Sequence, residues 1–211
     1  MEKLDLSIVV PLYNEAESLP ELVAWIDRVA RANGLTYEAI LVDDGSNDGS
    51  WEVVEKLKQS YPAVRGIGFG RNYGKSAALY CGFEAAEGEV VITMDADLQD
   101  SPDEIPALRR MILEEDYDLV SGWKKKRYDP LGKRLPSKFF NWTARTVSGI
   151  RLHDFNCGLK AYRRKVVKSI EVDGALPRFT PILPRPAGLH LAAERVSPHH
   201  PPAAGTPRTM I

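Results

Sequence analysis

The feature that most constrains the fold of this chain is an alternation of short apolar runs with longer segments of helical periodicity. Apolar runs of four to eight residues favour strands buried on both faces, whereas apolar positions three and four apart favour helices. The predicted strands cover residues 6–10, 37–42, 64–69, 90–94 and 118–122. The predicted helices cover residues 19–34, 51–61, 74–86 and 102–115. Strands that alternate with helices form βαβ units, so we predict an α/β fold with a largely parallel sheet.

The boundaries of the first two elements follow from local signals. Pro11 is expected to end the first strand, because proline cannot donate a backbone hydrogen bond. Ser18 is expected to cap the first helix, and Gly34 to end it. The positions with helical spacing are Leu19, Leu22, Val23, Ile26, Val29 and Ala30. We therefore predict that these six side chains form the buried face of that helix.

Polar residues cluster directly after each of the first four predicted strands. These clusters are Tyr13-Asn14-Glu15, Asp43-Asp44, Arg71 to Lys75, and Asp95 to Asp100. Right-handed crossovers bring the carboxyl ends of parallel strands to one edge of the sheet. Ligands of open α/β sheets bind beyond that edge. A single cluster could be a solvated turn, but four on one edge favour a binding site.

The fourth cluster has the donors of a metal site. In extended chain, residues two positions apart point to the same side, so Asp95 and Asp97 can direct their carboxylates to one point. Gln99 can add a third oxygen. Oxygen donors suit Mg²⁺ or Mn²⁺, either of which can also bridge to phosphate. The alternative interpretation is a polar turn with an aspartate that caps the next helix.

Several functional classes find no support. The first strand is not followed by the glycine-rich turn of dinucleotide-binding folds, and no Walker-type phosphate loop is present. A net charge of -1 lacks the basic signature of a nucleic-acid-binding protein, so we expect no nucleic-acid partner. No apolar run reaches the ~18 residues of a membrane-spanning helix. Cys81 and Cys157 form no metal or redox motif.

Together, the motifs resemble a known family. They are Pro11-Leu-Tyr-Asn-Glu15, Val42-Asp-Asp-Gly-Ser46 with Asp48, Arg71-Asn-x-Gly-Lys75, and Met94-Asp-Ala-Asp-Leu-Gln-Asp100. This ordered set resembles the inverting family-two glycosyltransferases, and most of all the polyprenyl-phosphate sugar transferases of the dolichol-phosphate mannose synthase type. The resemblance covers about residues 5–180. It implies a GT-A fold, which is Rossmann-like, with a mostly parallel central sheet flanked by helices.

The resemblance also implies roles on the donor side. Pro11, Tyr13 and Glu15 would lie around the base and ribose of a nucleotide, and Asp43 would hydrogen-bond the base. The segment from Arg71 to Lys75 would help to hold the nucleotide. Simpler interpretations remain open: Tyr13 could be a packing aromatic, and Glu15 could interact with a helix dipole.

The resemblance further implies that Asp95 and Asp97 bind the metal and the diphosphate, and that Gln99 completes the metal shell. Asp97 is therefore expected to be both a metal ligand and a catalytic residue. Lys75, beside Ser76, could alternatively be an ordinary residue at a helix start.

Residues 124–145 carry eight basic residues and one acid, with aromatic residues between them. A net charge of +7 over this segment fits an anionic membrane surface or a phosphate group. We expect Lys124 to assist the reaction and Arg127 to bind substrate. The alternative is a solvated basic loop followed by a helix.

Asp154 begins a D-x-x-x-G segment that, in the family, lies beside the transferred sugar. A phosphate monoester has its second pKa near ~6 and is largely ionised at neutral pH, so it hardly needs a general base. Asp154 would then orient groups or stabilise charge on the sugar. A sugar hydroxyl as acceptor would instead require Asp154 to be a true base.

The predicted activity is transfer of a sugar from a GDP- or UDP-linked donor to a polyprenyl phosphate, by a cytoplasmic protein peripheral to the cytoplasmic face of the membrane. One alternative is transfer to a glycan hydroxyl in cell-envelope polysaccharide synthesis. Another is a catalytically impaired protein that binds nucleotide sugars.

The expected organisation is one catalytic domain followed by an atypical tail. Residues 1–123 would form the nucleotide-sugar half, and residues 124–172 the acceptor half. Eight of the 15 prolines lie in residues 177–207, which predicts irregular chain over the tail, residues 173–211. A truncated or frame-shifted gene is one explanation. Arg178-Phe179-x-Pro181 resembles a family segment that closes over the donor.

Overall fold

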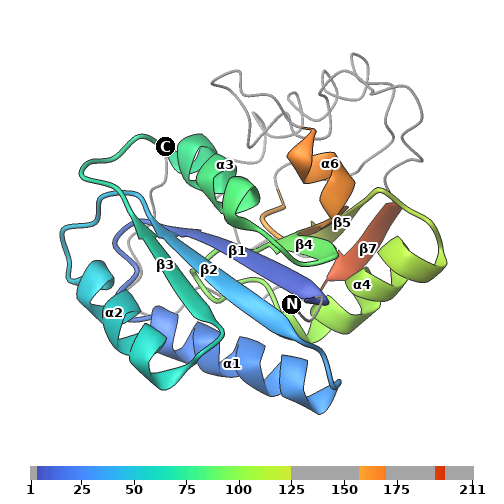
Figure 1. The fold of residues 1–211 in the computed structure, drawn as a ribbon, viewed down its shortest axis with the longest axis horizontal. Helices are drawn as coiled ribbons and strands as arrows, with labels where there is room; N and C mark the ends of the chain where they lie inside the picture. Colours follow the sequence, from blue (N-terminus) through green and yellow to red (C-terminus); the bar gives the residue numbers. More distant parts are fainter. Residues whose placement is uncertain (1–3, 125–156, 170–192, 198–211) are drawn as a thin grey trace.

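The computed structural model describes residues 4–124, 157–169 and 193–197. Within these residues the strands are β1 (Leu6–Leu12), β2 (Tyr37–Asp43), β3 (Val64–Gly68), β4 (Val90–Thr93), β5 (Leu119–Lys124), β6 (Lys160–Arg163) and β7 (Ala193–Ser197). The helices are α1 (Leu19–Ala32), α2 (Ser50–Ser60), α3 (Lys75–Ala85), the 3₁₀ helix η1 (Pro102–Glu104), α4 (Ile105–Glu114) and α6 (Arg164–Lys168). Figure 1 shows their arrangement.

The described strands form one sheet in the order β3-β2-β1-β4-β6-β5-β7. The pairs β3–β2, β2–β1 and β1–β4 are parallel, as is β5–β7. Strand β6 is antiparallel to both β4 and β5, so β5 runs in the same direction as β4. The predicted α/β fold with a largely parallel sheet is therefore confirmed. The sequence did not predict the antiparallel position of β6, nor strand β7 within the segment expected to be irregular.

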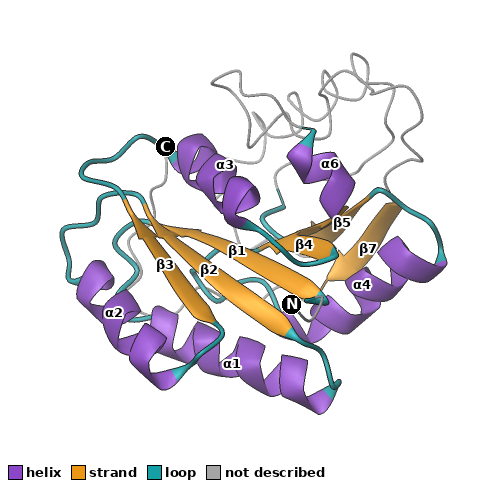
Figure 2. Cartoon of the chain, in the orientation of Figure 1, coloured by secondary structure: helices purple, strands orange, loops and turns teal. Residues whose placement is uncertain are grey.

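Helices cover both faces of the sheet (Figure 2). Helices α1, α2 and α4 pack on one face, and α3 and α6 on the other. Alternate residues of β1 divide between the two layers: Ile8 and Val10 face the first, and Val9 faces the second. Burial on both faces explains why this strand is almost continuously apolar.

The predicted end of the first strand at Pro11 is wrong, because β1 continues to Leu12. The carbonyl of Val9 accepts from Met94 N on the β4 side, and that of Leu12 accepts from Asp44 N on the β2 side. Backbone groups of successive residues point alternately to the two neighbouring strands, so Pro11 faces the β4 side, like Val9. Pairing with β4 ends at Val9 and Thr93, so Pro11 removes no hydrogen bond from the ladder.

The six positions predicted for the buried face of α1 are all buried. Gly34, with φ of 64°, follows the end of this helix, as expected from its left-handed conformation. Ser18 occupies the predicted N-cap position, but its side chain makes no capping bond. Its hydroxyl instead donates to the carbonyl and to Oε2 of Glu15, both at 3.0 Å.

The single helix predicted over residues 102–115 is divided into η1 and α4. The cause is local: the Ser101 hydroxyl accepts a hydrogen bond from Asp103 N at 3.3 Å and begins a short 3₁₀ turn. Pro102 and Pro106 lie at the starts of the two helices, where a missing N–H is harmless. Val53 of α2 and Met111 of α4 pack against the core but are only partly buried.

Candidate active site

The candidate site lies where the strand order reverses. From β1 the chain adds β2 and then β3 on one side, and returns to place β4 on the other side of β1. Such a switch point opens a crevice at the carboxyl ends of the two central strands. The loops after β1 and β4 border that point, and these carry Tyr13, Glu15, Asp95 and Asp97. The topology therefore brings the first and fourth polar clusters together, as the sequence predicts.

The β1–α1 loop is fastened to the β2–α2 loop through four hydrogen bonds. They run from Asn14 N to Ser46 Oγ (2.9 Å), Glu15 N to Ser50 Oγ (2.9 Å), Ala16 N to Asp48 Oδ2 (3.2 Å) and Asn47 N to Asn14 Oδ1 (2.9 Å). Burial raises the pKa of Asp48, but hydrogen bonds from Ser50 and Ala16 outweigh it and leave the pKa below its usual value. Asp48 is therefore a fixed hydrogen-bond acceptor between the two loops.

Asp43 is the last residue of β2 and Asp44 follows it, and the two side chains make different contacts. The buried Asp43 accepts from the backbone N–H and the hydroxyl of Ser46, both through Oδ1. Asp44 is also buried, and it accepts from Tyr73 N at 2.7 Å and Gly74 N at 2.9 Å. Burial raises the pKa of Asp44, and these two hydrogen bonds lower it in part. The sequence singled out Asp43 and missed the structural role of Asp44, although two adjacent aspartates at a strand end were a visible signal.

The loop after β3 carries a cation and an exposed aromatic ring. The Arg71 guanidinium lies 4.8 Å from the centroid of the Tyr73 ring, which packs edge-on against Phe69. Tyr73 is 58% exposed. Gly45, with φ of 74°, allows this close approach of the β2–α2 loop, since a Cβ there would lie 2.4 Å from the carbonyl carbon of Arg71. Arg71 is thus presented at the same edge as Asp43.

Lys75 and Asp95 form an ion pair between the first residue of α3 and the segment after β4. Both side chains are partly exposed, at 28% and 29%. On its other side the Asp95 carboxylate lies against Gly158, where a Cβ would come within 2.4 Å of Asp95 Cγ. Thr93 Oγ1 donates to the Gly158 carbonyl at 2.8 Å and fixes that backbone. The Asp95 carboxylate is therefore closely confined.

Asp97 and Gln99 lie in a tight reversal of the chain. Gln99 N donates to Asp97 Oδ1 at 3.1 Å. Leu98, between them, is buried and has φ of 61°, a conformation that is unfavourable for leucine. Strain of this kind tends to collect at functional sites. The reversal keeps both residues at the strand end beside Asp95.

The charge distribution suits a divalent cation. Burial raises the pKa of Glu15 to about 7, and the negative charges of Asp97, Asp95 and Asp48 add to the effect, although the Ser18 hydroxyl opposes it. Within residues 4–124, 157–169 and 193–197, no three His, Cys, Asp or Glu side chains are grouped to hold a metal. Two carboxylates and a carboxamide fit a cation whose coordination is completed by phosphate and water.

The remaining predicted site residues divide into two groups. Pro11 is buried in β1, and Tyr13 is half-buried in the loop that follows. Asp154, Arg127 and Arg178 lie outside the described residues, as does the side chain of Lys124 at the end of β5. The donor-side predictions are thus brought together at one edge, while the acceptor-side predictions remain predictions.

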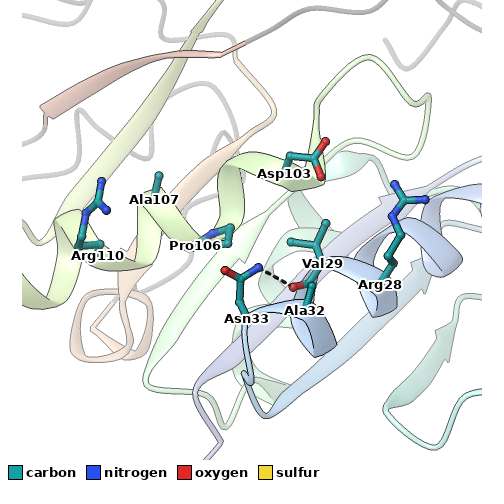
Figure 3. Close-up of a pocket in the computed structure, with 8 residues that line it drawn as sticks. All are labelled: Arg28, Val29, Ala32, Asn33, Asp103, Pro106, Ala107 and Arg110. Carbon is teal, nitrogen blue, oxygen red and sulfur yellow. Dashed lines mark hydrogen bonds between the residues drawn. The ribbon is translucent and has the colours of Figure 1, made fainter.

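A separate pocket of about 540 Å³ lies between α1 and α4 (Figure 3). Its lining includes Arg28 and Asn33 of α1, Asp103 of η1 and Arg110 of α4. The Asn33 side chain donates to the Val29 carbonyl at 2.8 Å. None of the lining residues belongs to the four polar clusters, so the pocket is distinct from the candidate site.

The fold is the GT-A fold of glycosyltransferases. Glucosyl-3-phosphoglycerate synthase from Mycobacterium tuberculosis, in complex with Mn²⁺ and UDP-glucose, superposes with a TM-score of 0.67 at 19% identity, over 94% of this chain and 72% of that one. Mannosyltransferase PcManGT from Pyrobaculum calidifontis, in complex with GDP-Man and Mn²⁺, superposes with a TM-score of 0.57 at 22% identity. The superposition covers 80% of this chain and 47% of that one. At these identities the likeness concerns the fold alone.

The chain belongs to glycosyl transferase family 2, whose model matches residues 7–171. It is 40% identical over 195 residues to the undecaprenyl-phosphate 4-deoxy-4-formamido-L-arabinose transferase of Shewanella sediminis, which covers 92% of this chain and 58% of that protein. The chain thus spans little more than half the length of the curated relatives it matches. In the described part of the chain, no helix is both long and apolar enough to cross a membrane.

Proposed function

We propose that the protein is an inverting glycosyltransferase that transfers a sugar from a nucleoside diphosphate sugar to undecaprenyl phosphate or a related polyprenyl phosphate. The observation that carries this proposal is the pair Asp95 and Asp97 beside the β1–β4 switch point, in a chain of glycosyl transferase family 2. The names of the relatives at about 40% identity support the lipid acceptor.

On the donor side, Asp95, Asp97 and Gln99 would hold Mg²⁺ or Mn²⁺. When bound, the metal neutralises the negative charge of the departing nucleoside diphosphate. The raised pKa of Glu15 supports this role, because it reflects burial beside the negative charge of these aspartates. The Mn²⁺ named for the two structural neighbours is in agreement.

Nucleotide binding would use Pro11, Tyr13, Glu15, Asp43 and Arg71. The backbone N–H of Asn14 donates to the Ser46 hydroxyl, and that of Glu15 donates to the Ser50 hydroxyl, so these bonds fix the first loop before any ligand arrives. Such preorganisation lowers the entropic cost of binding. We infer that the nucleotide is UDP or GDP, and the UDP-glucose and GDP-Man named for two structural neighbours support this choice.

On the acceptor side, a phosphate oxygen attacks the anomeric carbon opposite the leaving group. The new C–O bond forms as the bond to the nucleoside diphosphate breaks, and the configuration inverts. Lys124 and Arg127 would bind the acceptor phosphate, Asp154 would stabilise charge on the sugar, and Arg178 would close over the donor. A phosphate nucleophile is already ionised, so no strong base is needed. The protein would act at the cytoplasmic face of the membrane as a peripheral protein.

The direct test incubates the protein with radiolabelled UDP- and GDP-sugars, Mn²⁺ and undecaprenyl phosphate in detergent. Label that moves into organic solvent identifies the lipid product. Asp97→Ala and excess EDTA should each abolish this transfer, while Glu114→Gln, an exposed change on α4, should not. Label that enters only a water-soluble glycan would contradict the lipid acceptor, and full activity in EDTA would contradict the metal.

A further inference from the structure

The position of Lys75 is not explained by the stability of its helix. Lys75 is the first residue of α3, and the first turn of that helix contains no acidic residue. A positive charge at a helix N-terminus opposes the helix dipole and is unfavourable there. The ammonium group is instead directed away from the helix to the Asp95 carboxylate. The sequence therefore keeps an unfavourable positive charge at the N-terminus of α3. The ammonium group that carries this charge contacts Asp95, a predicted metal ligand.

The backbone that carries Lys75 is fixed. The preceding residue, Gly74, donates its N–H to Asp44, and its carbonyl accepts from Ala77 N at 3.0 Å. The partner carboxylate is confined as well, because Asp95 lies against Gly158. Separation of the pair therefore requires only rotation of the lysine side chain, without movement of either loop.

The ion pair itself is easily exchanged. Because both side chains are more than a quarter exposed, water screens their attraction, and such pairs contribute little. A divalent cation with oxygen ligands competes strongly for the same carboxylate. Lysine suits this exchange, since its compact charge is carried on a flexible stem and can move from one anion to another.

We propose that Lys75 is an internal counter-ion of the metal site. Its ammonium group occupies Asp95 in the metal-free protein, leaves that carboxylate when a divalent cation binds, and then pairs with the diphosphate of the donor. This inference rests on the proposed function for the identity of the diphosphate ligand. It gives Lys75 opposite effects on the two ligands: it weakens metal binding in the absence of nucleotide and strengthens nucleotide binding in the presence of metal.

The test compares the wild-type protein with Lys75→Met, which keeps most of the aliphatic stem and removes the charge. Mn²⁺ binding is measured by electron paramagnetic resonance without nucleotide, and UDP and GDP binding by calorimetry in saturating Mn²⁺. We expect Lys75→Met to bind Mn²⁺ about fivefold tighter or more, and to bind the preferred nucleotide about fivefold more weakly or worse. Lys75→Arg, which keeps the charge, should stay near the wild-type value for Mn²⁺.

The matched control is Lys58→Met, which removes an exposed lysine that pairs with Glu55 on α2. It should change neither affinity. Unchanged or weaker Mn²⁺ binding by a folded Lys75→Met protein would overturn the inference, and circular dichroism establishes that the variant is folded. Wild-type protein that binds Mn²⁺ and nucleotide but transfers no sugar would overturn the proposed function and leave the counter-ion role standing. No Mn²⁺ binding under either condition would overturn both.

Discussion

The carboxylate of Asp44 holds the start of helix α3 by accepting the backbone N–H of Gly74 at 2.9 Å. Its second oxygen accepts the N–H of Tyr73 at 2.7 Å. One buried side chain at the end of β2 thus fixes the loop that carries Arg71 and leads into Lys75. A carboxylate suits this position, because each of its two oxygens accepts one of these N–H groups and it presents no donor to either.

Asp44→Asn should therefore destabilise the protein and loosen this loop. The amide nitrogen of the new side chain cannot accept, so one of the two part-buried N–H groups loses its bond to this side chain. Because Gly74 N also donates to Asn72 Oδ1 at 3.1 Å, we expect a loss of about 1 kcal/mol. Chemical denaturation measures this loss, and nucleotide affinity should fall with it. Asp116→Asn is the control, because the side chain of Asp116, which pairs with Arg163, is 77% exposed. That control should stay within about 0.5 kcal/mol of wild type.

Gly158→Ala should disturb the Asp95 carboxylate. The added methyl group would lie 2.4 Å from Asp95 Cγ, so the carboxylate must shift. We expect Mn²⁺-dependent nucleotide binding to weaken, and turnover to fall about 10²-fold, because misplacement by about an ångström is enough to do so. Gly70→Ala is the matched change, since nothing lies within 4 Å of a Cβ at that position. Equal activity of the two variants would show that the position of Asp95 does not matter.

The raised pKa of Glu15 predicts a specific pH dependence of stability. In the folded protein the Glu15 carboxyl group has a pKa of about 7, so it keeps its proton up to about that pH. In the unfolded chain the same group has a pKa near 4.5 and releases the proton there. The native state therefore binds more protons over this interval, and its stability falls as the pH rises from about 4.5 to 7.

Glu15→Gln removes this titration and keeps an oxygen to accept from Ser18. The melting temperature of the variant, relative to wild type, should rise as the pH increases through that interval and level off above about 7. Differential scanning fluorimetry in EDTA, from pH 4 to 8.5, measures the difference. A constant offset across the range would mean that Glu15 is not perturbed.

Asp154→Asn should separate donor binding from chemistry. If Asp154 acts on the sugar and not on the nucleotide, the affinity for the nucleotide sugar remains close to that of wild type while turnover decreases about 10²-fold. Calorimetry with the donor and single-turnover transfer to the lipid provide the two measurements. A parallel loss of donor affinity would refute the assignment.

The parts of the fold predicted from sequence are those set by local periodicity. The buried face of α1 follows directly from the spacing of its apolar residues. The extent of β1 does not, because the effect of Pro11 depends on which neighbouring strand its nitrogen faces, and this is fixed by the sheet order. The antiparallel insertion of β6 between β4 and β5 does not follow from local periodicity either, because it depends on pairing between distant segments.

The candidate site shows the same division. The sequence places Asp95 and Asp97 at the end of a strand, and the parallel topology then brings them to the edge that carries Tyr13 and Glu15. The contacts between clusters could not be predicted in this way. The ion pair of Lys75 with Asp95 joins residues that no local pattern connects.

The hydrogen bonds between the first two loops have a consequence for protein engineering. Asn14 donates its backbone N–H to Ser46 and accepts one from Asn47, so neither loop has an independent conformation. A library that randomises residues 14–16 alone will recover mainly the parental sequence. Donor specificity will be changed more readily when residues 46–50 are varied in the same clones, because compatible pairs can then be selected together.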